Sequence, residues 1–372
     1  FLPSAVCLGD LLSRKGYQLN YMGGASLEFA GKGKLFKTHG FTSVLGRNEL
    51  LPQLDNEAYK TGWGLFDDSL FDMSYRRFLE LSESDKKFGL FMLTLDTHHP
   101  NGHPSASCSG TEYEDGSNKI LNAVACSDHL ITKFVNRISQ SPYADETIVV
   151  LVSDHLAMRN TAFDQLKKGN RRNLFMIIDP SNNEAKKIES VGSPLDIGAT
   201  ILPVVGYTGE IGFGRDLLNR EIPEEEKIFI HSNLWSWKNP VTAFWGFPKI
   251  KEKIEIDIDN HVVNIDGRGF EFPVLIELND ELQSTLKFQF NNSPDHKTLV
   301  KHRKELRKGE YFLMIDNCSN ASQLDKSLGK NGFCFLAGRG KEYSKIERLI
   351  ESTSYTSDEV KQLLNITASS KE

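Results

Sequence analysis

Short apolar runs alternate with amphipathic stretches along roughly the first 220 residues of the chain. Four runs have the length and composition of buried strands: residues 17–22, 88–95, 147–152 and 174–178. Residues 122–138 place apolar side chains about 3.6 positions apart, which predicts an amphipathic helix, and residues 10–15 and 196–202 predict shorter helices. This alternation predicts an α/β domain with a largely parallel sheet sandwiched by helices.

The pattern changes near residue 221, where Pro223 and the acidic residues after it predict a turn-prone linker. We therefore expect a domain of residues 1–220 and a smaller β-rich C-terminal domain of residues 221–372. Apolar and polar residues alternate as in antiparallel strands at residues 255–258, 261–265, 270–278 and 286–290, and residues 311–315 predict a further strand. The polar tail from Ser352 predicts a final helix.

Composition restricts the class of protein. The chain has 372 residues, 39% hydrophobic and 25% charged, which is typical of a soluble globular protein. Its net charge of -6 argues against non-specific nucleic-acid binding, and the basic run at residues 301–308 fits a solvated helix face. No stretch reaches the roughly 20 apolar residues that a membrane-spanning helix needs.

The five cysteines suggest two local pairs and one remaining thiol, Cys7. Cys108 with Cys126, and Cys318 with Cys334, would each close a short loop, a constraint worth about 3 kcal/mol per disulfide. Disulfides would place the protein outside the cytoplasm, with a partner for Cys7 upstream of Phe1. Five buried free thiols are the alternative.

Chemistry is expected at the carboxyl ends of the strands, where open parallel sheets bind ligands. The run at residues 148–152 ends in Ser153, Asp154 and His155. Carboxylate oxygen and imidazole nitrogen together suit a divalent metal ion, which favours an anionic substrate. Alternatively, the aspartate caps a turn and the histidine is a surface residue.

A second group follows the run at residues 88–95 and includes His98 and His99. Imidazoles at such a loop can donate hydrogen bonds to phosphate oxygens or protonate a leaving alkoxide. The alternative is one histidine bonded to the backbone and one exposed to solvent.

A third group consists of Phe29 and Lys32, which could cover and grip a phosphate-bearing headgroup. Lone lysines are more often solvated surface residues. Trp63, flanked by glycines and followed by Asp67 and Asp68, is a weaker candidate because such a residue is more often a packed loop aromatic. The sequence contains no P-loop, HExxH or GxSxG motif.

Four motifs occur together and in order: residues 29–32 (FAGK), 62–64 (GWG) with Asp67, 94–100 (TLDTHHP) and 153–158 (SDHLAM). Over residues 5–220 this series resembles the bacterial phosphoglycerol transferases, which are related to lipoteichoic acid synthases within the alkaline phosphatase and sulfatase superfamily. The resemblance of the β-rich remainder is weaker. The resemblance implies a sulfatase-like catalytic domain at residues 1–220.

By this resemblance the chain would transfer phosphoglycerol from phosphatidylglycerol to osmoregulated periplasmic glucans, at the periplasmic face of the bacterial inner membrane. A nucleophile on one divalent ion (Mn²⁺, Mg²⁺ or Zn²⁺) would hold phosphoglycerol covalently. The implied site residues are Asp154 and His155 as metal ligands, His98 as catalytic and substrate-binding residue, and Phe29, Lys32, Trp63 and His99 around the substrate.

One departure concerns the nucleophile. In the family the nucleophile and an acidic metal ligand lie upstream of the segment that matches residues 7–10, and here six residues precede that segment. We therefore expect an N-terminally truncated form with impaired activity, whose membrane anchor would also lie upstream.

Two other functions stay open. A sulfatase or phosphodiesterase of the same superfamily would pass its covalent intermediate to water, although the C-x-P-x-R motif of sulfatases is missing from the sequence. A non-catalytic binding protein could hold glycan with the aromatic-rich residues 235–245, which otherwise fit an interface between domains.

Overall fold

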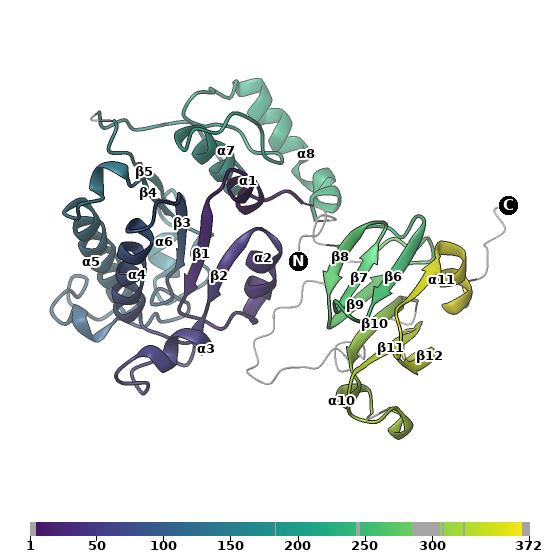
Figure 1. The fold of residues 1–372 in the computed structure, drawn as a ribbon. Helices are drawn as coiled ribbons and strands as arrows, with labels where there is room; N and C mark the ends of the chain where they lie inside the picture. Colours follow the sequence, from purple (N-terminus) through teal and green to yellow (C-terminus); the bar gives the residue numbers. More distant parts are fainter. Residues whose placement is uncertain are drawn as a thin grey trace. The chain divides into compact units, whose positions relative to one another are not determined.

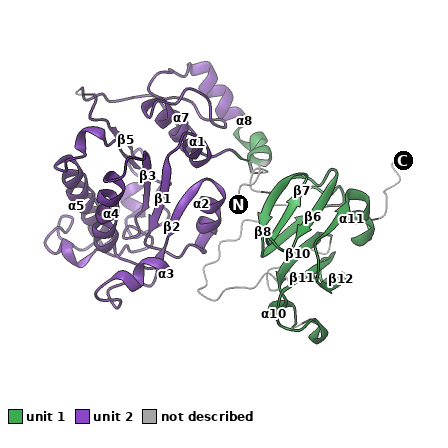
Figure 2. Ribbon diagram, in the orientation of Figure 1, with its two compact units in different colours: residues 1–5, 233–372 green, residues 6–232 purple. Residues whose placement is uncertain are grey.

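The computed structural model describes residues 5–182, 184–242, 246–284, 306, 309–322 and 324–366. The chain forms two compact units, one of Val6–Ser232 and one mainly of Asn233–Glu372 (Figure 2). The division falls within helix α8 (Glu224–Thr242), so the linker predicted after Pro223 is wrong. Three glutamates in the first turn favour the helix start through the helix dipole. The domain boundary at residues 220 and 221 stays a prediction.

The centre of the first unit is a parallel sheet in the order β2-β1-β3 (Figure 1). Its strands are β1 (Gln18–Gly23), β2 (Phe41–Leu45) and β3 (Phe88–Leu93), with Tyr21 of β1 paired to Val44 and Phe91. A separate pair joins β4 (Val149–Val152) and β5 (Phe175–Ile178) in antiparallel register. The predicted strands are therefore present, and β2 is an additional one.

Helices cover both faces of this sheet. Side chains of β3 alternate between the two faces because successive residues of a strand point in opposite directions. Phe88 packs against helices α4 (Asp67–Ser82) and α5 (Lys119–Ser139), which share a core cluster. On the other face Phe91 contacts Phe41 at 4.9 Å, and Phe36 of helix α2 (Lys32–Thr38) stacks on Tyr21 at 4.0 Å. The predicted helix-covered α/β architecture is confirmed.

Helix α5 follows directly from its sequence pattern. Its buried residues recur every three or four positions: Ile120, Ala123, Cys126, Ser127, Leu130, Phe134 and Ile138. Asn118 caps its start by accepting a hydrogen bond from the N–H of Leu121 at 3.4 Å. A disulfide between Cys108 and Cys126 ties the helix to the short 3₁₀ turn η3 (Ala106–Cys108), as predicted.

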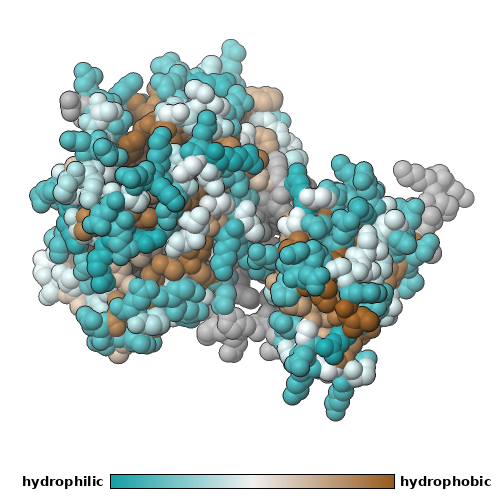
Figure 3. All heavy atoms as spheres, in the orientation of Figure 1, coloured by the Kyte–Doolittle hydropathy of each residue, from teal (hydrophilic) through white to brown (hydrophobic). Residues whose placement is uncertain are grey.

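The remaining helical segments of the first unit are short, and they complete the connections between strands. They are α1 (Leu8–Arg14), η1 (Phe29–Gly31), α3 (Arg47–Leu50), η2 (Leu51–Gln53), η4 (Ala144–Glu146), α6 (Phe163–Leu166) and α7 (Pro194–Val204). Hydrophilic residues cover most of the visible surface and apolar ones form separate patches (Figure 3). Among the described residues, no helix combines the length and apolar character needed to cross a bilayer.

In the described residues, the second unit forms two four-stranded antiparallel sheets, in the orders β12-β11-β10-β9 and β13-β6-β7-β8. Its elements are β6 (Lys253–Asp257), β7 (Val262–Ile265), β8 (Arg268–Glu271), β9 (Val274–Leu278), β10 (Tyr311–Asn317), α10 (Cys318–Ala321), η6 (Lys326–Leu328), β11 (Phe333–Arg339), β12 (Glu342–Arg348), β13 (Thr353–Thr356) and α11 (Ser357–Leu363). Apolar side chains of both sheets, such as Ile254 and Leu313, share one core. The predicted β-rich domain is confirmed.

Some details of this unit differ from expectation. Residues 270–278 form parts of two strands, β8 and β9, instead of one. The expected final helix is α11, which begins only after β13. The predicted disulfide between Cys318 and Cys334 is present and joins α10 to β11. The predicted strand at 286–290, and the basic run at 301–308 apart from Leu306, lie outside the described residues.

Candidate functional site

The loop after β1 brings Phe29 and Lys32 together. Ala30 and Gly31 both have left-handed backbone angles, with φ of 56° and 71°, so the chain reverses between the two side chains. The Lys32 ammonium nitrogen lies 4.5 Å from the centre of the Phe29 ring, within the range of a cation–π contact. A cation and an aromatic face are therefore presented side by side at the end of a central strand.

Trp63 joins this pair because its loop packs closely on the end of β1. Gly64 has a φ of 155° and forms an isolated bridge with Ala25; a Cβ at this position would collide with the Gly24 carbonyl. Trp63 meets Phe29 edge to face at 5.5 Å. Glycine at position 64 is thus required for the close approach that places the indole beside Phe29.

His98 continues the series of contacts formed by Lys32, Phe29 and Trp63, and we call these four residues the aromatic row. The His98 ring centroid lies 4.1 Å from that of Trp63 and 4.7 Å from that of His99, and the His98 and His99 rings are stacked. The Nδ1 of His98 lies 2.9 Å from the carbonyl oxygen of His99. A carbonyl can only accept, so Nδ1 carries the hydrogen, and Nε2 of the neutral ring keeps its lone pair.

Asp154 and His155 follow β4, and both side chains are exposed. His155 Nε2 lies 3.5 Å from Asp154 Oδ2, while His155 Nδ1 donates to the Leu156 carbonyl at 2.8 Å. As in His98, this fixes the hydrogen on Nδ1 and leaves Nε2 able to bind a metal ion.

Electrostatic coupling links this pair to the aromatic row. Burial lowers the pKa of Lys32 to about 8, against the opposing effect of the Asp154 carboxylate. Burial also lowers the pKa of His98, and the nearby His155 adds to this effect. The structure therefore brings the predicted site residues to one region at the strand ends: Phe29, Lys32, Trp63, His98, His99, Asp154 and His155.

A buried network behind His98 was not predicted. Both oxygens of Asp67, the first residue of α4, accept backbone N–H groups, from Leu95 at 2.6 Å and from Asp96 at 3.1 Å. Asp96 in turn accepts from the Ser105 hydroxyl at 2.5 Å. Asp67 and Asp96 are fully buried, so this network fixes the backbone from which the His98 loop emerges.

The two carboxyls of this network interact strongly. Burial raises the pKa of both, and for Asp96 the nearby Asp67 raises it further. Asp67 accepts two backbone N–H groups, whereas Oδ1 of Asp96 has no hydrogen-bond partner. We infer that Asp67 is the ionised member and that Asp96 holds a proton at neutral pH.

Only part of this network could have been predicted from the sequence. Asp67 stands at the start of a helix, where a carboxylate is favoured, but its hydrogen bond with Leu95 spans a sequence separation of 28. Ser105 has no sequence feature that marks it.

Asp154 and His155 have the chemistry of two ligands of a divalent ion, an oxygen donor and an imidazole nitrogen. They fit such an ion in part, since two ligands do not complete a site. Within the described ranges, Cys7, Asp10 and His39 form the only group of three or more potential ligands whose donor atoms lie within 4.8 Å of one another. That group is a helix cap: Asp10 Oδ2 accepts from Cys7 N–H and is bonded to His39 Nδ1, each at 2.8 Å.

Comparison with known proteins identifies the family of the chain. The sulfatase family matches residues 3–207, and the family described as phosphoglycerol transferase I, middle domain, matches residues 252–371. Phosphoglycerol transferase I from Shigella flexneri, and that from Escherichia coli O139:H28, are each 35% identical over 326 residues. These alignments cover 87% of this chain and 42% of each relative, so the chain spans less than half of their length.

A solved structure supports the fold. The lipoteichoic acid synthase LtaP from Listeria monocytogenes superimposes with a TM-score of 0.51 at 17% identity, covering 73% of this chain and 68% of that protein. Related sequences thus match both halves of the chain, and a related fold matches most of it. The chain belongs to the sulfatase family and is a homologue of phosphoglycerol transferase I.

Proposed function

We propose that this chain forms the headgroup-binding and metal-binding part of a phosphoglycerol transferase, which moves phosphoglycerol from phosphatidylglycerol to a periplasmic glucan. One observation carries the proposal: Lys32, Phe29, Trp63 and His98 form a continuous row, and Asp154 and His155 interact electrostatically with Lys32 and His98. The homologues, which are longer than this chain, are named phosphoglycerol transferase I.

The row suits a glycerol phosphate group. The Lys32 ammonium would pair with the phosphate, and the faces of Phe29 and Trp63 would cover the glycerol carbons, because aromatic faces pack well against C–H groups. His98 Nε2 would accept the proton of the attacking glucan hydroxyl, or return a proton to the leaving diacylglycerol. His99 supports His98 by stacking and is the weaker substrate ligand.

Members of the sulfatase and alkaline phosphatase superfamily generally use a divalent metal ion. Asp154 and His155 would be two of its ligands, and the ion would neutralise negative charge on the phosphoryl oxygens. Mn²⁺, Mg²⁺ and Zn²⁺ all fit an oxygen and nitrogen donor pair, with Zn²⁺ and Mn²⁺ better suited to the imidazole.

The proposed donor and acceptor also define where the protein works. Phosphatidylglycerol lies in the membrane and the glucan in the periplasm, so we place the activity at the periplasmic face of the inner membrane. The two disulfides support an oxidising compartment.

Two alternatives stay open. A phosphodiesterase or sulfatase would use the same site and pass its covalent intermediate to water. A glycan-binding protein would use the aromatic stretch at 235–245, in which Trp235 is 83% exposed; residues 243–245 lie outside the described residues.

A headgroup-labelled phosphatidylglycerol assay, run with and without β-glucan, tests the proposal. Label that enters the glucan supports transfer, and release that is indifferent to glucan supports hydrolysis. Binding of glycerol phosphate is measured in parallel, and Lys32→Ala should weaken it, whereas the exposed Lys37→Ala should not. Glucan affinity that survives both metal removal and Asp154→Ala, without any glycerol phosphate binding, would replace the proposal with the binding function.

A further inference from the structure

The chain that follows Asp154 carries a concentration of positive charge. Residues 155–175, which we call the basic segment, contain five lysines and arginines and one acidic residue, Asp164. The five are Arg159, Lys167, Lys168, Arg171 and Arg172. The whole chain has a net charge of -6, so this segment is opposite in sign to the protein as a whole.

Two of these cations are available to a ligand. Arg159 and Lys168 are exposed, and neither side chain forms an ion pair with any residue that the structure describes. Arg159 lies over the Phe163 ring at 5.7 Å, a contact that leaves its charge in place. The acidic Asp164 pairs with Lys167 at 2.6 Å, so the one carboxylate of the segment is balanced locally.

Large apolar side chains are exposed in the same segment. Leu156, Met158 and Leu174 are 44%, 53% and 48% exposed. Single exposed hydrophobic residues are common on soluble proteins, whereas a group of them in one place marks an interaction surface. The position of these three side chains relative to one another is therefore what matters.

Hydrogen bonds place the two stretches that carry them next to each other. The Arg171 guanidinium donates to the carbonyl oxygen of Ala157, which lies between the first two exposed residues. The Leu174 N–H donates to the Ser153 hydroxyl at 3.0 Å, and the Ser153 N–H donates to the Leu174 carbonyl at 2.9 Å. The apolar side chains and the cations therefore lie in one region, beside the proposed metal ligands.

We propose that the basic segment docks onto the surface of an anionic lipid bilayer. Arg159 and Lys168 would lie at the level of the lipid phosphates, and Leu156, Met158 and Leu174 would enter the boundary between headgroups and acyl chains. The charges and the apolar side chains carry the lipid assignment, whereas the choice of phosphatidylglycerol rests on the proposed function. This surface would hold the donor lipid close to the site.

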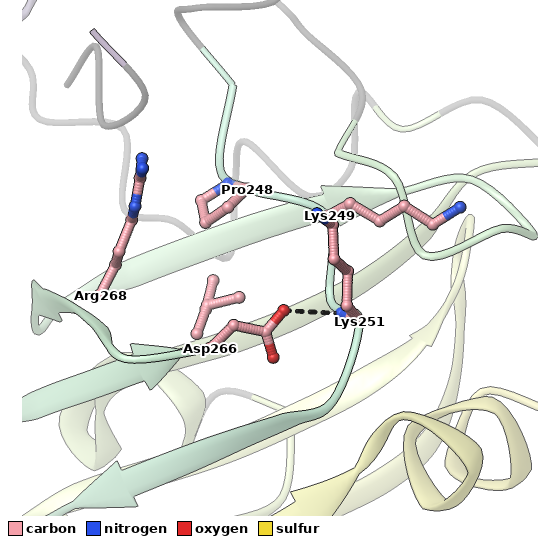
Figure 4. Close-up of a pocket in the computed structure, with 6 residues that line it drawn as sticks. Pro248, Lys249, Lys251, Asp266 and Arg268 are labelled. Atoms are coloured by element: carbon pink, nitrogen blue, oxygen red, sulfur yellow. Dashed lines mark hydrogen bonds between the residues drawn. The ribbon is translucent and has the colours of Figure 1, made fainter.

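A soluble polyanion, such as a phosphoglycerol-substituted glucan, would match the charges alone. It leaves the exposed apolar side chains without a partner, so the structure favours the bilayer. A pocket of the second unit provides the contrast (Figure 4). Lys249 and Lys251 line it beside Asp266, which accepts a hydrogen bond from the Lys251 N–H at 2.7 Å, and its lining includes none of the exposed large hydrophobic side chains that the structure describes.

Sedimentation of the 372-residue chain with lipid vesicles tests the proposal. Vesicles of phosphatidylglycerol and phosphatidylcholine in equal parts are compared with vesicles of phosphatidylcholine alone. All proteins carry Lys32→Ala/His98→Ala, so that binding of the headgroup at the aromatic row does not contribute. We expect binding to the anionic vesicles only, because the cations need negative charge at the lipid surface.

Two variants of the basic segment separate charge from apolar contact. Arg159→Gln/Lys168→Gln should weaken binding to the anionic vesicles about tenfold or more, because two cations near the surface are lost. Met158→Ser/Leu174→Ser should also weaken it about tenfold or more, because less apolar area is buried in the bilayer. Circular dichroism checks folding, and the corresponding single variants replace a double variant that unfolds.

Two matched controls lie in the second unit. Lys249→Gln/Lys251→Gln removes the same charge, and Leu324→Ser/Ile350→Ser replaces two exposed apolar side chains. Both should bind within about twofold of the parent protein.

Three results would overturn the proposal. They are no binding to anionic vesicles, equal losses in the segment variants and the controls, and unchanged binding in Met158→Ser/Leu174→Ser. The last result would leave charge as the only contribution, as expected for a soluble polyanion. Because vesicle binding is measured without catalysis and without the aromatic row, its failure is distinguishable from failure of the transfer assay.

Discussion

The ring of Trp63 lies 4.1 Å from the ring of His98, tilted by 39°. Trp63 lies in the loop before α4, and His98 lies in the loop after β3. Their contact joins the pair Phe29 and Lys32 to the imidazoles of His98 and His99. The row is continuous only because Trp63 bridges it.

Replacing Trp63 by alanine should therefore weaken glycerol phosphate binding about tenfold, because an aromatic contact contributes about 0.5–1.5 kcal/mol beyond its buried area. Trp63→Phe should retain most of the affinity. Phe229→Ala, which removes an exposed aromatic ring on α8, is the matched control. Titration calorimetry measures all three, and equal affinity of Trp63→Ala and wild type would remove Trp63 from the site.

Asp67 should be required for the order of the His98 loop. Asp67→Asn replaces one acceptor oxygen with an N–H₂ group that faces a backbone N–H, so we expect a loss of about 1–3 kcal/mol in unfolding free energy. Amide hydrogen exchange of Leu95 and Asp96 should rise in parallel. Asp72→Asn, at a side chain that is 70% exposed, should cost less than about 0.5 kcal/mol. Unchanged exchange at Leu95 in Asp67→Asn would contradict this role.

The buried pair should also make stability depend on pH. A carboxyl with a raised pKa binds its proton more tightly in the folded chain than in the unfolded one, where carboxyls titrate near 4. The unfolding free energy should therefore fall as pH rises from about 4 towards the pKa of Asp96, about 8.

Urea unfolding at pH 5 and pH 8 measures this effect. Asp96→Asn should reduce the decrease by on the order of 1 kcal/mol. Asp72→Asn is again the control. Identical pH slopes in wild type and Asp96→Asn would show that Asp96 does not hold the proton.

The disulfide between Cys108 and Cys126 should contribute to the stability of the first unit. Both sulfurs are buried, and the bond closes a loop with a sequence separation of 18. Cys108→Ala/Cys126→Ala should lower the unfolding free energy by about 3 kcal/mol. Cys7→Ser, at the free thiol, should have a smaller effect, and equal losses in the two variants would contradict this account.

Local patterns in the sequence were sufficient to predict the strand ends and much of the fold. The apolar runs that became β1 and β3 end where a parallel sheet presents side chains to ligands, and the run that became β4, which pairs with β5 instead, ends just before Asp154. The positions of Lys32, His98 and Asp154 along the chain therefore predicted their neighbourhood in space.

Features that depend on long-range pairing were not predicted. Strand β2 contains Thr42 and Ser43, so its apolar signal is weak, and it is recognisable only by its pairing with β1. Helix α4 was also not predicted, although it has buried residues at helical spacing, such as Leu70 and Ser74, which is the same local signal that predicted α5. The contact of Asp67 with the His98 loop requires the packed structure, because no local rule joins positions 67 and 95.

The proposed function requires a metal ion at Asp154 and His155, close to the aromatic row. Paramagnetic broadening of NMR signals by Mn²⁺ tests this requirement, because broadening depends on distance from the ion. We expect selective loss of the Trp63 indole and His98 ring signals, abolished in Asp154→Ala/His155→Ala and retained in His39→Gln. Broadening that is abolished by His39→Gln instead, or that spares both Trp63 and His98, would rule out a metal ion at Asp154 and His155.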